Sequence, residues 1–372
     1  MGLSAAWALS RAGVAVRVLD QDTLPNPRGS SVDDHRLIRH AYGAQAGYMR
    51  MIDPAYAAWR LLFAETGEAL HAPTGVLAIG AAGSPWLAAS RAALRGDGHA
   101  MEDLAASDVA ARYPFLSADG VDAAFHLPSG GVLLARRIVA SLAALLARRD
   151  VAVTRGLAIE IDPTRAAVTL ADGATLSADL LVVAAGPWAP RLVPGLAARV
   201  RPARQVLVRL APPEKHAEAW ARAPMLLDLA EDGGFYAVPP VAGTPLKIGD
   251  HRFGATVDPD GPRDATAAEA SEILAFASRR IRDLDRYRIL SASACWYDVE
   301  PGERFLVEKL GPRAWVMSGF SGHGFKFGPL LGLALARAAR DPALAAGIGG
   351  WAAGEAPPPP GLLHDIAGEQ TP

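Results

Sequence analysis

The first twenty residues place the tightest limit on what this chain can fold into. Small and apolar residues at 2–12 predict a helix, and Gly13 suits its end because glycine adopts a left-handed backbone without strain. The apolar run at 14–19 predicts a strand buried on both faces of a parallel sheet, and Asp20 closes that strand. This order is typical of the second half of a βαβ unit that binds a dinucleotide.

The spacing of the glycine and the acidic residue supports the same interpretation. The fingerprint of such units is G-x-G-x-x-G, with an acidic residue about 20 positions further on. With Gly2 as the third glycine, Asp20 follows 18 residues later, and the first two glycines and their strand would precede Met1. We therefore expect Gly2 and Asp20 to contact a cofactor in a sheet whose first strand is missing. The alternative is a truncated, non-catalytic remnant that binds its cofactor poorly.

Composition limits the classes of partner. Hydrophobic residues make up 51% and charged residues 20% of the 372 positions, which is enough apolar surface for a sizeable core. The 37 Lys and Arg against 39 Asp and Glu give a net charge of −2, so we expect neither nucleic acid nor an anionic membrane as a partner. One cysteine, Cys295, allows no intramolecular disulfide and no cysteine-clustered zinc site, and we expect no metal.

No segment predicts a membrane span. The longest uncharged stretch, residues 71–90, is interrupted by two prolines and three glycines and cannot form one spanning helix. The start of the chain lacks the basic region of a secretory signal, so we expect a cytoplasmic protein. The proline-rich tail, residues 351–372, predicts a disordered extension.

Periodicity along the rest of the chain predicts a mixed α/β protein. Helices are expected at about 48–66, 84–96, 135–149 and 265–281. Strands are expected at about 75–79, 206–210, 234–239, 246–248 and 288–297. The long series of antiparallel-type strands indicates a second, sheet-based domain.

Two segments carry cations that suit an anionic ligand. Arg36 and Arg39 are three residues apart, and on a helix both would extend from one face. Residues 315–340 predict a strand, a loop with three glycines and a helix, whose first N–H groups favour a negatively charged group. Lys326 lies in the first turn of that helix, where a lysine is unusual unless it binds an anion; the alternative is a solvated surface lysine.

Several longer runs occur in one order along the chain. The most specific are Arg-Leu-Ile-Arg-His-Ala-Tyr-Gly at 36–43 and Gly-Phe-Ser-Gly-His-Gly-Phe-Lys at 319–326, and Ala-Gly-Pro-Trp at 185–188 and Ala-Cys-Trp-Tyr at 294–297 lie between them. Nearly the whole chain resembles monomeric sarcosine oxidase and its N-methyl-amino-acid oxidase relatives. The resemblance implies an α/β fold in which a doubly wound FAD-binding domain interleaves with a mixed-sheet substrate domain. The implied boundaries are 1–68, 130–205 and 290–350 for the first, and 69–129 and 206–289 for the second.

The resemblance also assigns the cofactor contacts. Cys295 matches the cysteine that holds the flavin covalently through a thioether, and Arg36 matches an arginine close to the flavin. The further residues expected to contact FAD are Ser30, Gly186, Gly322, Gly324 and Lys326. The alternatives are an inert buried thiol for Cys295 and a structural salt bridge for Arg36.

Substrate and oxygen are assigned in the same way. Arg39 and Lys326 match the pair that binds the substrate carboxylate. Lys247 matches the lysine that promotes the reduction of O₂, because a fixed cation stabilises the negative charge that develops on oxygen. Tyr236 and His251 match groups of the substrate pocket. The alternatives are an exposed strand-end lysine for Lys247 and a structural histidine for His251.

The implied reaction is oxidation of the C–N bond of a small secondary amine or N-methyl amino acid by a monomer, with O₂ as acceptor and hydrogen peroxide as product. A flavin dehydrogenase that passes electrons to a protein acceptor is the alternative. The sequence departs from the family at Val32, where a histidine is usual, and at His35, where a threonine is usual. Both positions lie near the flavin in the family, so they bear on the substrate more than on the fold.

Overall fold

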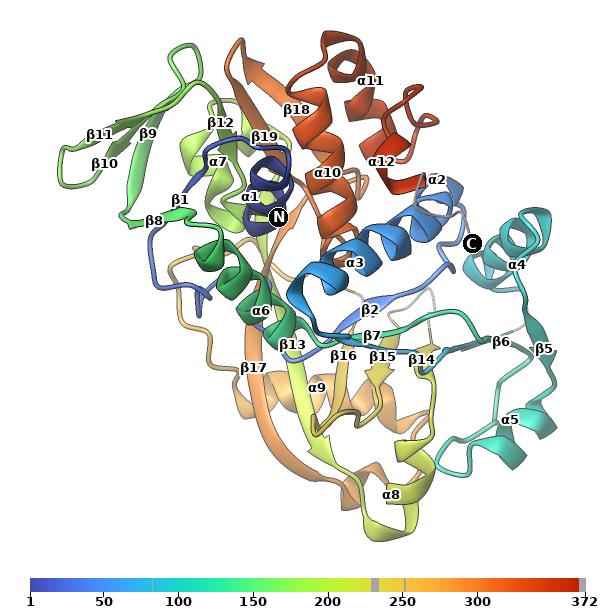
Figure 1. The fold of residues 1–372 in the computed structure, drawn as a ribbon. Helices are drawn as coiled ribbons and strands as arrows, with labels where there is room; N and C mark the ends of the chain where they lie inside the picture. Colours follow the sequence, from blue (N-terminus) through green and yellow to red (C-terminus); the bar gives the residue numbers. More distant parts are fainter. Residues whose placement is uncertain (82, 229–233, 251, 368–372) are drawn as a thin grey trace.

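An eight-stranded mixed sheet occupies one half of the molecule, and helices that pack on smaller sheets occupy the other half (Figure 1). The structure is a computed structural model that describes residues 1–81, 83–228, 234–250 and 252–367. The large sheet has the order β17-β13-β16-β15-β14-β4-β6-β5. Its strands are β4 (Val76–Gly80), β5 (Glu102–Leu104), β6 (Ala123–Leu127), β13 (Arg201–Ala211), β14 (Met225–Asp228), β15 (Phe235–Val238), β16 (Leu246–Asp250) and β17 (Arg288–Val299).

Four smaller sheets complete the fold, with the orders β1-β8, β12-β19-β18, β11-β10-β9 and β2-β7-β3. Their strands are β1 (Arg17–Asp20), β2 (Arg36–Ile38), β3 (His71–Ala72), β7 (Gly131–Leu133), β8 (Ala152–Arg155), β9 (Ala158–Asp162), β10 (Ala167–Leu170), β11 (Thr175–Ser177), β12 (Leu181–Val183), β18 (Leu306–Gly311) and β19 (Ala314–Ser318). The helices are α1 (Gly2–Arg11), α2 (Ala46–Arg50), α3 (Ile52–Thr66), α4 (Pro85–Gly96), α5 (Ala106–Arg112), α6 (Ala135–Arg148), α7 (Ala189–Leu192), α8 (Glu214–Ala221), α9 (Ala267–Ser278), α10 (Gly328–Ala338), α11 (Pro342–Ala352) and α12 (His364–Ala367). The expected mixed α/β class is confirmed.

The N-terminal helix and strand form as predicted, but the burial of the strand does not. α1 ends before Gly13, whose φ of +77° is the expected left-handed cap. β1 pairs in parallel with β8, and among the described residues neither β1 nor β12 has a partner along its second edge. The prediction of a strand buried on both faces over 14–19 is wrong: the strand begins at Arg17, and Val14 is 38% exposed. One neighbouring strand covers too little of β1 to bury it.

α1 is anchored by an unusually close approach to α10, and the two helices lie side by side in Figure 1. A Cβ atom added to Gly332 of α10 would lie 2.5 Å from the backbone oxygen of Ser4. Trp7 of α1 is fully buried in the same core. Because α10 follows directly on the glycine loop 319–324, this helix contact also fixes the loop.

The segment that carries Arg36 and Arg39 is not a helix. Residues 36–38 form the short strand β2, which pairs antiparallel with β7, with Arg36 opposite Leu133. Pairing with β7 overrides the helical spacing of the arginines. The two side chains consequently do not share a helix face, and they contact different partners in the site described below.

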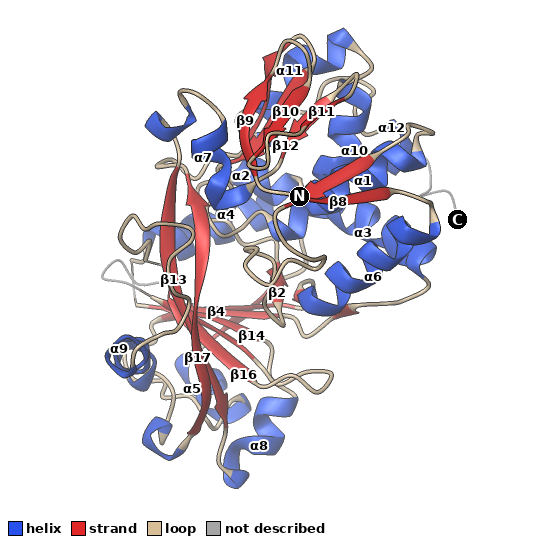
Figure 2. Cartoon of the chain, turned by 90° about the vertical axis from the view of Figure 1, so that its left-hand side faces the viewer, coloured by secondary structure: helices blue, strands red, loops and turns tan. Residues whose placement is uncertain are grey.

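Two long strands join the halves of the molecule. β13 and β17 run antiparallel over their whole length and extend from the large sheet toward the helical half (Figure 2). Cys295 of β17 lies opposite Gln205 of β13, and Lys247 of β16 lies opposite Arg209 of β13. This pairing places the cysteine and the lysine of the predicted site on one continuous sheet.

The C-terminal tail folds back onto the protein as far as it is described. Leu362 is fully buried and Ile366 is 4% exposed, because both pack into the main core near α3. The structure thus contradicts a disordered extension for residues 351–367. None of the helices described in the structure is long and apolar enough to cross a membrane. The division into a cofactor domain and a substrate domain stays a prediction.

The α1–α10 contact gives a first prediction. Gly332→Ala should lower the free energy of unfolding by about 1–3 kcal/mol, because its methyl group meets backbone that cannot move aside easily. Gly96→Ala is the matched control: it lies at the end of α4 with open space around it and should be neutral or slightly stabilising. Chemical denaturation of both variants measures the difference. Equal stability of the two would contradict the close approach of the helices.

Candidate active site

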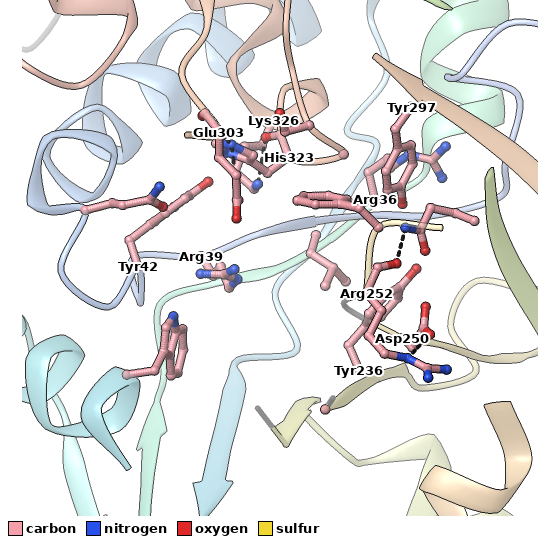
Figure 3. A pocket seen from close by; sticks show the side chains of 18 of the residues that line it. Arg36, Arg39, Tyr42, Tyr236, Asp250, Arg252, Tyr297, Glu303, His323 and Lys326 are labelled. Atoms are coloured by element: carbon pink, nitrogen blue, oxygen red, sulfur yellow. Dashed lines mark hydrogen bonds and ion pairs between the residues drawn. The ribbon is translucent and has the colours of Figure 1, made fainter. Parts of the chain in front are cut away.

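A cavity of about 660 Å³ opens between β2, strands β15 and β16 of the large sheet, the start of α4 and the glycine loop. Figure 3 shows Arg39, Tyr42, Glu303, His323 and Lys326 on one side of it, and Tyr236, Asp250, Arg252 and Tyr297 on the other. Five Lys and Arg side chains line the cavity against two carboxylates. The cavity is therefore electropositive and suits an anionic ligand.

Arg39 and Lys326 form a buried cationic pair on one wall. Arg39 is 7% exposed, its guanidinium lies 4.7 Å from the Tyr42 ring centroid, and its Nη1 atom has no hydrogen-bond partner among the described residues. Lys326 is 5% exposed and donates to the backbone oxygen of His323 at 2.8 Å. Burial, and then the charge of Arg39, holds the pKa of Lys326 well below its usual value, and burial lowers the pKa of Arg39. Of the carboxylates in the described ranges, Glu303 is the one that acts on the pKa of both residues.

A second lysine of the site is fully paired. Lys247 is 2% exposed, with its Nζ 2.5 Å from Asp33 Oδ2 and 2.9 Å from the backbone oxygen of His35. Asp33 also accepts hydrogen bonds from Nη1 of Arg36 and from Nη2 of Arg209, each at 2.6 Å. Burial raises the pKa of Asp33, but the three cations outweigh it and hold the pKa far below its usual range. The structure does not support the alternative of an exposed strand-end lysine for Lys247.

Four of the predicted cofactor contacts, Ser30, Arg36, Gly186 and Cys295, lie close together. Cys295 is 4% exposed and its Sγ lies 3.6 Å from the backbone oxygen of Ser30, while the Ser30 hydroxyl donates to the Trp296 oxygen at 2.5 Å. Arg36 also donates to the Ser30 oxygen. Gly186 has a φ of +52°, and a Cβ there would meet only the Ser30 hydroxyl, at 3.9 Å. The backbone at Gly186 therefore has open space beside it that a ligand can reach.

The glycine loop packs tightly against the protein itself. Gly322 has a φ of +78°, and a Cβ there would lie 2.3 Å from the ring of Tyr297. A Cβ on Gly324 would lie 2.6 Å from the ring of Phe320. Both glycines are thus required for the shape of the wall, whatever else contacts them.

Other predicted residues lie apart from the cavity or outside the described chain. Asp20 accepts hydrogen bonds from Asn26 at 2.7 Å and from the Asp22 amide at 3.0 Å, so it organises the loop after β1. Gly2 lies against Ala184 of β12. His251 falls outside the described residues. Tyr236, in contrast, does line the cavity.

The comparison with known proteins decides the family. Residues 1–338 match the family model described as FAD dependent oxidoreductase. The chain belongs to this family of enzymes.

Individual relatives and structures agree with this assignment. Proteins named N-methyl-L-tryptophan oxidase, from Yersinia pestis and Yersinia pseudotuberculosis, are 29% identical over 350 residues, which is 92% of this chain and 92% of theirs. NikD, an unusual amino acid oxidase essential for nikkomycin biosynthesis, has a TM-score of 0.76 at 22% identity, over 92% of each chain. Glycine oxidase from Geobacillus kaustophilus has a TM-score of 0.75 at 19% identity, over 89% of this chain and 90% of that one. These structures confirm the expected fold.

The residues present fit the cofactor of this FAD-dependent oxidoreductase. The open backbone at Gly186, the Ser30 hydroxyl and the Cys295 thiol lie together, and Arg36 adds a cation. Arg263 adds a second: it lies between Trp188 and Trp296, and none of its three guanidinium nitrogens has a hydrogen-bond partner in the part of the chain that is described. An electron-rich, partly anionic group is what such donors favour.

Sequence reasoning missed several residues of the site. Asp33 and Arg209 complete the Lys247 cluster, Tyr42 and Trp86 flank Arg39, and Glu303 approaches the cationic pair. Arg209 lies opposite Lys247 through the register of β13 and β16, which the sequence does not show. Nothing in the sequence pointed to Trp86, which enters the cavity from the start of α4.

His40 forms a further cluster that the sequence did not indicate. The ligand atoms of His40, Asp53 and His99 lie within 4.8 Å of one another. His40 Nε2 contacts Asp53 Oδ1 at 2.9 Å, and its Nδ1 contacts the Ser129 hydroxyl at 3.2 Å. Both ring nitrogens of His40 are thus in hydrogen bonds, one of which ties the end of β2 to α3 and the other to the loop between β6 and β7.

The cationic pair predicts a conflict between stability and binding. Lys326→Met removes one of two buried like charges and should raise the free energy of unfolding of the ligand-free protein by about 1–2 kcal/mol. Lys309→Met, at an exposed position of β18, should leave it nearly unchanged. Thermal denaturation of both variants tests this. A destabilised Lys326→Met protein would mean that the charge of Lys326 is already neutralised within the protein.

Proposed function

We propose that this FAD-dependent oxidoreductase oxidises the C–N bond of a secondary amine that carries a carboxylate, such as an N-methyl amino acid, and uses O₂ as acceptor. The observation that carries the proposal is the Arg39–Lys326 pair, which is buried, aimed at the cavity and incompletely neutralised. A substrate carboxylate would complete it, since a planar guanidinium and a point charge together suit that group. The names of the Yersinia relatives support the same substrate class.

The protein supplies binding and orientation. When bound, FAD accepts the hydride equivalent that leaves the substrate carbon next to nitrogen. Arg39 and Lys326 hold the carboxylate, which fixes the direction of the amine. The rings of Tyr42 and Trp86, whose centroids lie 4.7 Å and 5.6 Å from the Arg39 guanidinium, exclude water and give an apolar or aromatic substrate side chain a surface to pack on. The imine product is released by hydrolysis to an aldehyde and an amine.

Lys247 serves the oxygen half of the reaction. Its ammonium is buried on the cavity wall and held by Asp33, so a fixed positive charge faces the space where oxygen would be reduced. Such a charge stabilises the negative charge that develops on oxygen. Cys295, buried beside Ser30 and Arg36, is the proposed covalent attachment point of the flavin. The monomeric state and the cytoplasmic location expected from the sequence stay predictions.

The carboxylate site predicts a selective loss. Arg39→Met should lower kcat/KM for an N-methyl amino acid. The lost stabilisation is about 2–5 kcal/mol, because the substrate carboxylate is then buried without its guanidinium partner. The decarboxylated N-methyl amine should be affected far less. Arg252→Met also removes a cation from the cavity wall, but that arginine is paired with Asp250 and Glu272 and should change neither substrate selectively. Equal losses for both substrates in Arg39→Met would exclude an amino acid as substrate.

The covalent link predicts that the yellow colour of the protein stays with the polypeptide after acid precipitation. Cys295→Ala removes the attacking sulfur, so its flavin should pass into the supernatant. Absorbance of pellet and supernatant measures the distribution. Release of flavin from the unsubstituted protein would disprove attachment through Cys295 and leave non-covalent binding.

The oxygen site predicts that the two half-reactions separate. Lys247→Met keeps the length of the side chain and removes the charge, so reduction by amine under nitrogen should keep a similar rate while reoxidation by air slows by several orders of magnitude, each tenfold being about 1.4 kcal/mol. Stopped-flow absorbance times each half-reaction. Slow reoxidation of the unsubstituted protein would indicate a dehydrogenase, and unchanged reoxidation of the variant would mean that Lys247 does not act on oxygen.

A further inference from the structure

We propose that Asp33 is a positioning residue for the oxygen reaction, which keeps the buried ammonium of Lys247 charged and fixed in place. The inference rests on the proposed role of Lys247 and extends it to a residue from a distant part of the chain. Asp33 belongs to the loop between β1 and β2, 214 positions before Lys247 on β16. Their contact therefore joins the helical half of the molecule to the large sheet.

Among the residues that the structure describes, Lys247 has one carboxylate partner. Asp33 and Lys247 are 3% and 2% exposed, so water contributes almost nothing to either charge. Nζ contacts Asp33 Oδ2 at 2.5 Å, and its other polar contact, at 2.9 Å, is the neutral backbone oxygen of His35. A buried ammonium keeps its proton only if an anion offsets the lost hydration.

The remaining groups that face Lys247 oppose its charge or are neutral. Arg36 from β2 and Arg209 from β13 are cations that disfavour a further positive charge. The Tyr236 ring of β15, with its centroid 5.9 Å from Nζ, is neutral because burial raises the pKa of its hydroxyl. His35 is neutral as well, since burial and Lys247 lower its pKa to about 3. Asp34 is directed to Arg209 and Arg136, at 3.1 Å and 2.9 Å, rather than to Lys247.

Removal of Asp33 has a defined electrostatic consequence. Burial already lowers the pKa of Lys247 to about 8, and Asp33 opposes this effect. Asp33→Asn leaves the amine among two arginines without an anion in contact, so its pKa must fall further. Below the new pKa the lysine is charged and active on oxygen, and above it the lysine is neutral and inactive. The change therefore narrows the pH range of the oxygen reaction from its alkaline side.

The first measurement follows the lysine itself. The chain contains four lysines, Lys215, Lys247, Lys309 and Lys326, so NMR of protein labelled with ¹³C at the lysine ε-carbon gives few signals, and Lys247→Met assigns the one of interest. With the oxidised holoenzyme we expect a titration midpoint near 8. In Asp33→Asn the midpoint should fall by about one pH unit or more. Asp34→Asn, the adjacent carboxylate that does not touch Lys247, is the matched control and should leave it unchanged.

The second measurement gives the rate at which oxygen reoxidises the reduced enzyme, as a function of pH. Reoxidation of photoreduced holoenzyme, timed by stopped-flow absorbance, should show the same midpoints, so that at about pH 8 Asp33→Asn reoxidises about fivefold more slowly than the unsubstituted enzyme. Reduction by amine should not share this pH shift. Asp33→Glu, which restores the carboxylate, should bring the midpoint back toward 8. A variant that only loosened the fold would lower both half-reactions at every pH.

The outcomes distinguish the proposed role of Asp33 from the proposed oxygen function of Lys247. An unchanged Lys247 midpoint in Asp33→Asn overturns the role of Asp33, even if Lys247→Met slows reoxidation as proposed. A shifted midpoint that reoxidation does not follow, together with normal reoxidation of Lys247→Met, overturns the oxygen function of Lys247 and the inference with it. If Asp33→Asn does not fold, Arg209→Met provides the test in the opposite direction, because loss of a nearby cation should raise the midpoint; no rise would overturn the inference.

Discussion

The buried carboxylate of Asp33 is the electrostatic centre on which the site depends. It holds cations from three elements, Arg36 of β2, Arg209 of β13 and Lys247 of β16, within 2.6 Å of its oxygens. These elements come from both halves of the molecule, so the same contacts join the halves and set the charge of the cavity wall. Three cations against one carboxylate leave an excess of positive charge, which the neighbouring Asp34 offsets only in part. A site with this balance favours electron transfer to an uncharged acceptor such as O₂, because the product gains negative charge.

The opposite wall of the cavity contains two buried cations, Arg39 and Lys326, whose charges are not neutralised within the described chain. Arg39 and Lys326 are as buried as the Asp33 cluster but have no carboxylate in contact among the described residues, and the Tyr42 and Trp86 rings compensate only weakly through cation–π contacts. Such a pair lowers the stability of the free protein. The tight glycine loop and the close α1–α10 packing hold it in place. Stability from the core thus maintains a binding site that would otherwise relax, as expected where function requires strain.

The sequence predicted many of the longer elements of the fold but not the contacts between distant segments. Runs with clear periodicity, such as α1 and α6, were found within a few residues, because local patterning determines them. β2 was mistaken for a helix because its state depends on pairing with β7, which lies about 95 residues away along the chain. Site residues that belong to specific motifs, Arg39, Lys247 and Lys326, do line one cavity. Asp33 was missed because a single aspartate in a turn-rich loop is ordinarily solvated, and only the approach of β16 and β13 buries it.

The two buried lysines differ in their partners, and this difference supports the different roles that we propose for them. Both lie on the cavity wall and both are almost inaccessible to water, so burial alone would not distinguish them. Lys247 has a resident carboxylate at 2.5 Å, and a substrate carboxylate could bind there only in competition with Asp33. Within the described part of the chain, Lys326 has a backbone oxygen as its one hydrogen-bond partner and a second cation nearby, so an incoming carboxylate gains the full attraction of both charges. This difference supports our proposal that the anionic end of the substrate binds at Lys326 and Arg39, while Lys247 keeps its charge for an acceptor that arrives neutral. An exchange of these roles would require Asp33 to lie on the other wall of the cavity.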